Sequence, residues 1–515
     1  MKLKKAFAWF LAIVMLFSML GAFPASAHAG VSPLLHKGPR AVLANKTSKA
    51  KPGYDLFTCQ LNLEQDTNCY DPYEMRTAYN TDKLISAGYT GKGSTIVIVD
   101  AYQSPRIVDQ LNYFDSYYGL PGLNGLGAAP KATLGTFTQV APDGLTPFDD
   151  TDGNMIGWAE EISLDVEWAH AIAPGANITL VLAKTNEDAD LYSATKYAVD
   201  NNLGDVISQS FGEDESCVDS NLLKQEHALF AQATNKHITL LASSGDDGAS
   251  QLTCDGSTYH KAASSPASDP LVTGVGGTEL HAMYYCFAEL GCEPTANPAP
   301  GTYQDEVAWN ETMYDEDAQL PYSIATGGGY SVLYKAPYFQ TVAVKGAKGR
   351  GVPDVSYNAA VYHGVLTYLD IPGISAEDGN QQFWLFGGTS AGSPQWAAIV
   401  AIADQKAGKR LGFLNQALYL YALNPQKYAS QFHDVTSGNN TVVNFDASNP
   451  PNPTYVKGFN ATKGWDATTG LGSPKVDGLV AFLTRYTSTY ADGTKAIKGS
   501  DPANIGRSGP HQMGH

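Results

Sequence analysis

Short apolar runs alternate along the chain with longer segments of mixed apolar and polar residues. Four runs are typical of buried strands: 94–100 (STIVIVD), 178–183 (ITLVLA), 205–208 and 237–242 (HITLLA). Five segments are typical of helices: 106–118, 157–172, 191–202, 221–234 and 394–410. This alternation predicts an α/β fold with a mainly parallel central sheet covered by helices on both faces.

Polar residues stand just after three of the predicted strands. They are Asp100, Ser210 and Asp246. In parallel sheets of this kind the ligand site lies beyond the carboxyl ends of the strands. We therefore expect these three residues to lie near a functional site.

The remaining segments lack clear periodicity. Residues 28–70 predict a loose N-terminal arm or short leader, and residues 491–515 predict a polar tail. Residues 285–330 and 439–460 are rich in turn-forming residues and predict loops. No linker composition divides residues 71–490, so we expect one large domain there.

The first 27 residues have the parts of a secretory signal peptide. Three lysines precede an almost wholly apolar run at 6–23, and the ASA sequence at 25–27 is a small-residue cleavage site. An uncleaved membrane anchor is the alternative, because the run is near the spanning length. No other segment is long and apolar enough to span a bilayer, so we expect a secreted, extracellular protein.

Six cysteines follow the predicted signal peptide. An even number in an oxidising compartment favours disulfides. Nearness in sequence suggests three pairs: Cys59 with Cys69, Cys217 with Cys254, and Cys286 with Cys292. A metal site is the alternative, but no C-x-x-C or clustered Cys/His spacing supports zinc.

Composition and charge narrow the classes of function. The chain has 33 Lys+Arg against 51 Asp+Glu, a net charge of −18, and 43% hydrophobic residues. The apolar content excludes a disordered acidic protein. The negative charge argues against a nucleic-acid partner, because phosphate binding needs a basic surface.

Residues 387–394 (GGTSAGSP) carry a candidate nucleophile. Two glycines permit a tight turn, Ser390 follows, and Pro394 is expected to start a helix. Ser390 would then lie near the positive end of that helix, which favours developing negative charge. A glycine-rich turn with Ser393 as the helix cap is the alternative.

Residues 160–167 (EEISLDVE) carry a candidate general base. Glu161 and Asp165 are four positions apart, so on a helix their carboxylates share one face. Such a pair can share a proton, so that one carboxylate acts as a base while the other orients it. A solvated acidic helix face is the alternative.

Two further acidic segments could carry chemistry. In residues 244–248 (SGDDG), a protonated Asp246 could donate a hydrogen bond to an oxyanion, or the acid could cap a helix or bind a metal. Asp434 and Asp466 flank a long loop, and two carboxylates with nearby carbonyls suit a hard cation such as calcium. Turn-forming aspartates are the alternative at this second place.

These segments occur in order with further short motifs: EEISLDVE (160–167), SQSFG (208–212), SSGDDG (243–248), SPASDPLVTGVGGT (265–278), RGVPDVS (350–356), GGTSAGSP (387–394), FHDV (432–435) and GWDATTGLGSP (464–474). The ordered set resembles the sedolisin family of serine-carboxyl peptidases, kumamolisin-like members included. The resemblance runs from about residue 71 to 490 and implies a subtilisin-like fold in a single large catalytic domain.

The resemblance implies a role for each candidate. Ser390 matches the nucleophile, Glu161 the general base, Asp165 the acid that hydrogen-bonds Glu161, and Asp246 the oxyanion carboxyl. Asp100 matches, more loosely, an acid that extends this network. Five residues fall on the family's calcium positions, two through carboxylates and three through main-chain carbonyls: Asp434, Asp466, Val435, Thr462 and Gly464.

This chemistry predicts activity in acid. Glu161 must be ionised to accept a proton while Asp246 must be protonated to donate one, and an unperturbed carboxyl titrates near about pH 4. We therefore expect an acid-acting, calcium-stabilised, monomeric endopeptidase with protein or peptide substrates. Phe211 and Tyr330 are candidates for lining its substrate subsites. The family's large propeptide is replaced here by residues 28–70, so the arm either does that job in reduced form or is not needed.

Three other interpretations compete with this one. Residues 388–392 also match the G-x-S-x-G motif of α/β-hydrolase esterases, with His433 as the downstream histidine. A subtilisin with Asp100 as its acid lacks a His-Gly-Thr-like motif after it. The third is an inactive binding protein on a peptidase fold, which would not need Ser390, Glu161, Asp165 and Asp246 together.

Overall fold

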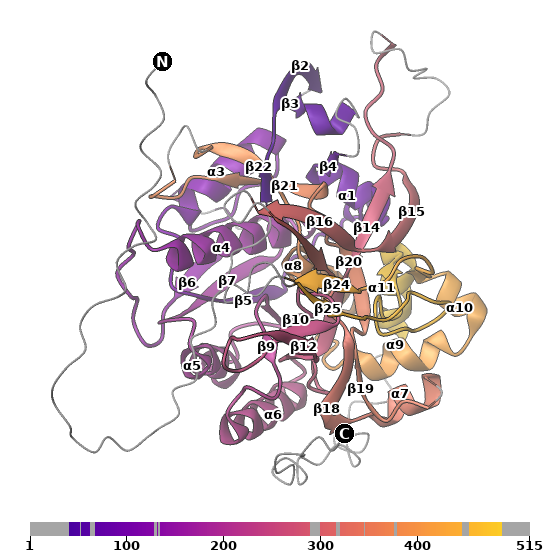
Figure 1. The fold of residues 1–515 in the computed structure, drawn as a ribbon. Helices are drawn as coiled ribbons and strands as arrows, with labels where there is room; N and C mark the ends of the chain where they lie inside the picture. The colour runs from indigo at the N-terminus through magenta and orange to yellow at the C-terminus, as the bar shows by residue number, and fades with distance from the viewer. Residues whose placement is uncertain are drawn as a thin grey trace, which may run out of the picture.

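A computed structural model describes residues 41–486 except 52, 62–66, 128–130, 132–133, 289–298, 316–319, 345, 375–378 and 445–452. Within these residues, eight strands form a central sheet (Figure 1). Seven run in the order β15 (Tyr303–Ala308), β14 (Thr273–Ala282), β10 (Thr239–Ser243), β8 (Val206–Gln209), β5 (Thr95–Ala101), β7 (Asn177–Ala183) and β6 (Phe137–Val140), and β20 (Val355–Asn358) pairs with β14. All pairings are parallel except that of β14 with β15.

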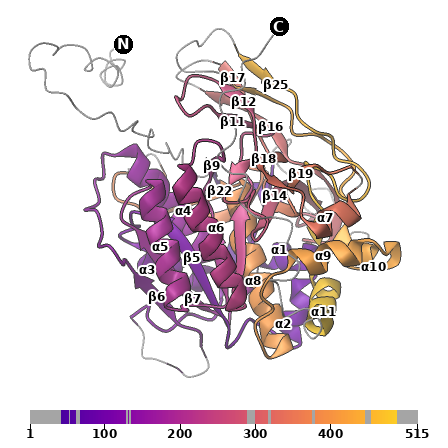
Figure 2. The same ribbon diagram turned by 90° about the horizontal axis from the view of Figure 1, so that it is seen from below.

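Successive residues of β5 face opposite sides of this sheet, as the pleat of a strand requires. Ile96 and Ile98 pack with α3 (Ile107–Tyr118), α4 (Gly153–Ile172), α8 (Thr389–Ala407) and α11 (Val476–Tyr486). Val97 and Val99 pack with α5 (Asp188–Asp200) and α6 (Ser220–Asn235). Figure 2 shows α4, α5 and α6 beside β5 and β7. The predicted α/β fold with helices on both faces is confirmed.

A second sheet joins the N-terminal segment to the domain. Its order is β1 (Ala41–Leu43), β22 (Gln382–Phe386), β21 (His363–Leu369) and β4 (Asn68–Tyr70). Between β1 and β4 lie β2 (Lys46–Lys51), β3 (Tyr54–Phe57) and the 3-10 helix η1 (Thr58–Leu61).

The described part of residues 28–70 therefore differs from the loose arm that we expected. Leu56, Phe57 and Tyr70 are fully buried. The Tyr70 hydroxyl donates to the main-chain oxygen of Leu280, 2.6 Å away on β14. Each strand here contributes too few apolar residues to show a period, and the burial arises from contacts with residues far along the chain.

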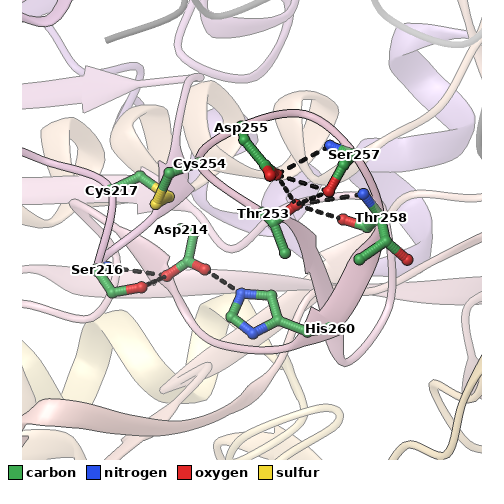
Figure 3. Close-up of a disulfide and its surroundings, with 9 residues drawn as sticks. All are labelled: Asp214, Ser216, Cys217, Thr253, Cys254, Asp255, Ser257, Thr258 and His260. Atoms are coloured by element: carbon green, nitrogen blue, oxygen red, sulfur yellow. Dashed lines mark hydrogen bonds and ion pairs between the residues drawn. A yellow bond between two sulfur atoms is a disulfide. The ribbon is translucent and has the colours of Figure 1, made fainter. Parts of the chain in front are cut away.

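Two of the expected disulfides are confirmed, Cys59–Cys69 and Cys217–Cys254. The first lies within the N-terminal segment, and the second joins the chain after β9 (Glu213–Asp214) to the loop between β11 (Ser250–Leu252) and β12 (Tyr259–Lys261) (Figure 3). The expected pair Cys286–Cys292 includes a residue outside the described part of the chain, as do the signal peptide at 1–27 and the tail at 491–515.

The two predicted loops were wrong in part. Residues 285–330 contain β15, the hairpin of β16 (Asn310–Asp315) and β17 (Leu320–Ala325), and the start of β18 (Gly329–Lys335). Residues 439–460 contain the paired strands β24 (Val442–Asn444) and β25 (Thr454–Val456). These are sheet-edge and hairpin strands in which polar residues interrupt the apolar alternation, and some of their exposed positions are aromatic, such as Tyr314 and Tyr455.

The helix after the GGTSAGSP turn also begins earlier than predicted. Its first residue is Thr389, with Gly388 as the N-cap, and Pro394 lies inside it. The first four N–H groups of a helix have no partner within it, but Pro394 is the sixth residue and removes one internal hydrogen bond. Ser390 is thus in the first turn of α8, and Ser393 is not its cap.

The other elements complete the domain. The helices are α1 (Pro72–Ala78), α2 (Thr81–Ser86), α7 (Tyr338–Ala343), α9 (Asn415–Ala422) and α10 (Pro425–Ala429); the strands are β13 (Ser264–Ser265), β19 (Gly349–Val352), β23 (Phe432–His433) and β26 (Ser473–Pro474). Among the described residues, no helix combines the length and hydropathy needed to cross a bilayer.

Candidate active site

Three polar segments meet at the carboxyl edge of the central sheet. Asp100 is the penultimate residue of β5, Ser210 follows β8, and Asp246 lies in the turn after β10. The strands β10, β8 and β5 are consecutive neighbours in the sheet. The fold therefore brings these segments to one edge, where the sequence predicted a site.

Helix α4 carries three acidic residues, Glu161, Asp165 and Glu167, into the interior. The Asp152 carboxylate caps the helix by accepting from the Asn154 N–H at 2.9 Å. Glu161 and Asp165 lie one turn apart, and both are fully buried. The Ser210 hydroxyl donates to Asp165 Oδ2 at 2.8 Å, which joins the helix to the end of β8.

Burial controls the protonation of this acidic cluster. It raises the pKa of Asp165 well above its usual range, and the charges of Asp100 and Glu161 raise it further. Burial and the Glu161 charge also raise the pKa of Asp100 well above its usual range. The neighbouring Glu160 has its pKa raised to about 8, again mainly by burial. Asp100, Asp165 and Glu160 therefore hold protons at pH values where exposed carboxyls have lost theirs.

The turn before α8 positions Ser390. Gly388 has φ of +92°, which favours glycine, and a Cβ at this position would lie 2.6 Å from Asp246 Oδ2, so a larger residue would displace that carboxyl. Ser390 is 7% exposed and is the second residue of the helix. One turn on, Ser393 Oγ lies 2.8 Å from Ser208 Oγ and fixes α8 to β8. The helix also packs against α4, which carries Glu161.

Asp246 is held against the positive end of α8. Its Oδ1 accepts from the Thr389 N–H at 2.7 Å and from the Thr389 hydroxyl at 2.9 Å. The Thr389 hydroxyl in turn accepts from the Gly245 N–H at 3.0 Å. The helix N-terminus and these donors fix Asp246 Oδ1 at Thr389, the residue that precedes Ser390. This role of Thr389 could not be predicted from the sequence, because threonine is common in turns.

A model of the Subtilase family matches residues 153–418, which include α4, the turn after β10 and the start of α8. The chain belongs to the subtilase family. It is 32% identical to kumamolisin of Bacillus sp. (strain MN-32) over 79% of this chain and 62% of that protein. It is 30% identical to sedolisin of Pseudomonas sp. (strain 101) over 80% of this chain and 61% of that protein. The chain thus spans less than two thirds of these curated relatives.

A solved structure agrees with these relatives. The structure of Pseudomonas sedolisin, a serine-carboxyl proteinase complexed with two molecules of pseudo-iodotyrostatin, matches this subtilase with a TM-score of 0.63 and 26% identity. The match covers 82% of this chain and 99% of that chain. The sedolisin resemblance and the subtilisin-like fold are therefore confirmed.

The subtilase fold contradicts the esterase interpretation. The histidine that this interpretation needs, His433, is stacked on Tyr303 with 3.6 Å between the ring centroids. Burial, aided by the charge of Lys475, lowers its pKa to about 3. An imidazole with this pKa is a weak base.

The candidate calcium residues of this subtilase come together from two segments. The Gly464 N–H donates to Asp434 Oδ1 at 2.9 Å, and Tyr428 donates to the same oxygen at 3.0 Å. Asp466 Oδ2 accepts from the Thr462 N–H at 2.7 Å. Val435 and Asp466 are buried, whereas Thr462 is exposed.

This donor set fits calcium. Two carboxylates and main-chain carbonyls are hard oxygen ligands, which Ca²⁺ prefers. Burial raises the pKa of Asp466 to about 6, against several hydrogen bonds that lower it. A buried carboxyl in this position gains from a nearby cation. Because Thr462 is expected to contribute only its main-chain oxygen, its exposed side chain is no obstacle.

Proposed function

We propose that this chain is a secreted serine-carboxyl endopeptidase that hydrolyses proteins at acidic pH. The observation that carries the proposal is the Asp246 carboxyl, fixed by Thr389 at the N-terminus of α8 beside Ser390. A carboxyl in that position serves an oxyanion only when it is protonated, which connects the geometry to acid. The serine-carboxyl relatives support the same conclusion.

In the proposed mechanism, Ser390 Oγ attacks the carbonyl carbon of the scissile peptide bond. Glu161 accepts the hydroxyl proton as general base, and Asp165 orients Glu161 while Ser210 orients Asp165. The tetrahedral oxyanion accepts a hydrogen bond from protonated Asp246. Glu161 then returns its proton to the leaving amine, and a water molecule repeats the sequence on the acyl-enzyme.

The cluster around Glu161 suits this cycle. The buried neighbours Asp100 and Asp165 hold protons because their pKa values are raised well above the usual range. Protonated neighbours can donate hydrogen bonds, so they stabilise one ionised carboxylate among them. We propose that Glu161 is that carboxylate and that Asp100 extends the network through Asp165.

The calcium proposal rests on Asp434 and Asp466 as carboxylate ligands, with Val435, Thr462 and Gly464 contributing main-chain oxygens. A calcium ion there would neutralise two acids and join the chain after β23 to the loop before β26. Its role would be to stabilise the folded state. No step of the reaction passes through it.

We also propose boundaries for the signal peptide and the catalytic domain, residues for the substrate subsites, and an oligomeric state. Residues 1–27 direct secretion, and residues 71–490 form the catalytic domain, onto which the arm from residue 41 packs. Tyr330 is a candidate subsite residue, as is Phe211; the Tyr330 ring is 40% exposed and lies against Phe459 and Trp465. An exposed aromatic side chain suits the apolar residues of an extended substrate. We expect a monomer.

Fragment analysis of an unfolded protein tests the proposal. Incubation at pH 4 with the mature chain should release internal fragments, and mass spectrometry should identify new N-termini within the substrate. Ser390→Ala, which removes only the nucleophile, should release none above background. Equal cleavage by the two chains, or release only of terminal residues by the wild type, would contradict an endopeptidase that uses Ser390.

A further inference from the structure

Two histidines and a glutamate gather where the two sheets meet. Glu279 and His281 are two positions apart on β14, so they share one face of that strand. His363 is the first residue of β21, in the other sheet. Each of the three offers a ligand atom, and these atoms all lie within 4.8 Å of one another.

The spacing of these atoms suits a tetrahedral metal ion. Zinc binds imidazole nitrogen and carboxylate oxygen at about 2.0–2.1 Å, which places tetrahedral ligand atoms about 3.4 Å apart. His281 Nε2 lies 3.1 Å from Glu279 Oε1, and His363 Nδ1 lies 3.9 Å from the same oxygen. The two distances fall on either side of the ideal value, and the third, between the two histidine nitrogens, is at most 4.8 Å, so the side chains must shift to complete the geometry.

The surroundings of His281 add a second argument. A histidine that binds a metal through one ring nitrogen usually donates its other N–H to a carboxylate. His281 Nδ1 lies 2.6 Å from Asp305 Oδ1, on the ring side opposite Nε2. Asp305 is paired directly with His281 across the β14–β15 ladder, so the backbone fixes this contact.

The second histidine has a main-chain contact that zinc binding would replace. His363 Nδ1 lies 3.1 Å from the main-chain oxygen of Leu280, the residue between the other two ligands, and only an Nδ1–H can make this contact, because a carbonyl oxygen accepts. To bind an ion through Nδ1, His363 must release this proton and give up the hydrogen bond. The nearby Glu311 is already engaged, since it accepts from the Val361 and Tyr362 N–H groups. The ligands are partly accessible, with side-chain exposures of 24% for Glu279, 32% for His281 and 16% for His363, so an ion can enter.

We propose that Glu279, His281 and His363 form a binding site for one Zn²⁺ ion, with water as the fourth ligand and Asp305 orienting His281. This site is separate from the calcium residues and from the proposed active site. A bound ion would join β14 of the central sheet to β21 of the sheet that includes the N-terminal segment. Its role would be structural, and it is independent of the proposed peptidase activity.

The test is titration of the full chain with zinc chloride at pH 7.5, with the heat of binding measured by calorimetry. The wild type should bind one zinc ion at this site. His281→Gln and His363→Gln should each weaken binding at least about 100-fold, and Asp305→Asn about 10-fold to 100-fold. Free zinc at 100 times its dissociation constant should raise the melting temperature by about 3 °C in the wild type.

His260→Gln is the matched control. His260 also contacts a carboxylate, that of Asp214, and its side chain is 45% exposed (Figure 3). It belongs to no group of three possible ligands among the described residues. This variant should bind zinc as the wild type does. Histidines in the tail, His511 and His515, are unchanged in every variant, so any zinc that they bind cancels.

Either of two results would overturn the proposal. One is the absence of zinc binding by the wild type up to 1 mM, which would make the cluster an ion-pair network around His281. The other is zinc binding by His281→Gln and His363→Gln equal to that of the wild type. Circular dichroism verifies that each variant is folded, and His363→Gln decides the matter if His281→Gln does not fold.

Discussion

Replacing Asp246 by alanine and by asparagine separates its structural contacts from its proposed hydrogen bond to the oxyanion. In the wild type, Asp246 Oδ1 accepts two hydrogen bonds from Thr389. Asparagine keeps an oxygen that can accept both, and it places an NH₂ group where Oδ2 stands. Alanine removes the oxygen and the donor together.

The expected magnitudes differ strongly between the variants. Loss of one oxyanion donor costs about 10²–10³ in kcat, so Asp246→Ala should lose at least that much at the acid optimum. It should also lose about 2 kcal/mol of stability, because two hydrogen bonds contribute about 1 kcal/mol each. Asp246→Asn should keep most of the stability and retain kcat within about tenfold of the wild type.

The pH dependence distinguishes the variants further. An ordinary carboxyl loses its proton above about pH 4 and then repels the oxyanion. The asparagine amide donates at every pH. The loss of kcat/KM on the alkaline side should therefore move to higher pH in Asp246→Asn.

The assay is hydrolysis of a fluorogenic peptide from pH 2 to 8 with the wild type and both variants, with melting curves to establish that each is folded. A folded Asp246→Ala enzyme with near-normal turnover would refute the assigned role. So would an Asp246→Asn enzyme that is as inactive as Asp246→Ala, since the amide donor should rescue activity.

Three other predictions concern stability and are best measured on Ser390→Ala, which cannot digest itself. Burial raises the pKa of Asp165 above its unfolded value of about 4, so the folded state binds a proton that the unfolded state has lost. The free energy of unfolding should therefore fall as pH rises from 4 to 8, and Asp165→Asn should flatten this fall. Asp354 is fully buried and accepts from Arg350 Nη1 at 2.7 Å, so Asp354→Ala should lower the free energy of unfolding in urea by about 3–5 kcal/mol. Asp477 forms an exposed ion pair, so Asp477→Ala should lower it by at most about 1 kcal/mol. Calcium chelation should lower the melting temperature, and Asp434→Asn should lower it equally and abolish the response to the chelator; an unchanged melting temperature with the chelator would count against the calcium site.

The alternation of strands and helices from residue 94 onward could be predicted because the strands lie in a parallel sheet that helices cover on both faces. β5 begins and ends within one residue of the predicted run, and α3 begins one residue later than predicted. The edge strands were not predictable in the same way. Half of their side chains face solvent, and their pairing depends on partners far along the sequence.

The candidate site, like the fold, could be predicted only in part. The positions of Asp100, Ser210 and Asp246 after strands could be inferred, because strand ends share one edge of a parallel sheet. The hydrogen bonds of Thr389 to Asp246 and of Ser210 to Asp165 could not, because they join residues 143 and 45 positions apart. The cluster of Glu279, His281 and His363 was missed for the same reason, since its third ligand comes from another sheet.

The most direct test of the central claim is the pH profile of protein hydrolysis from pH 2 to 9 for the wild type, with Ser390→Ala and Glu161→Gln measured beside it. A carboxyl mechanism predicts a maximum near about pH 3–5, loss of activity by neutral pH, and no activity in either variant at any pH. A neutral or alkaline maximum, or substantial activity in Glu161→Gln, would contradict the account and assign the base chemistry to another group.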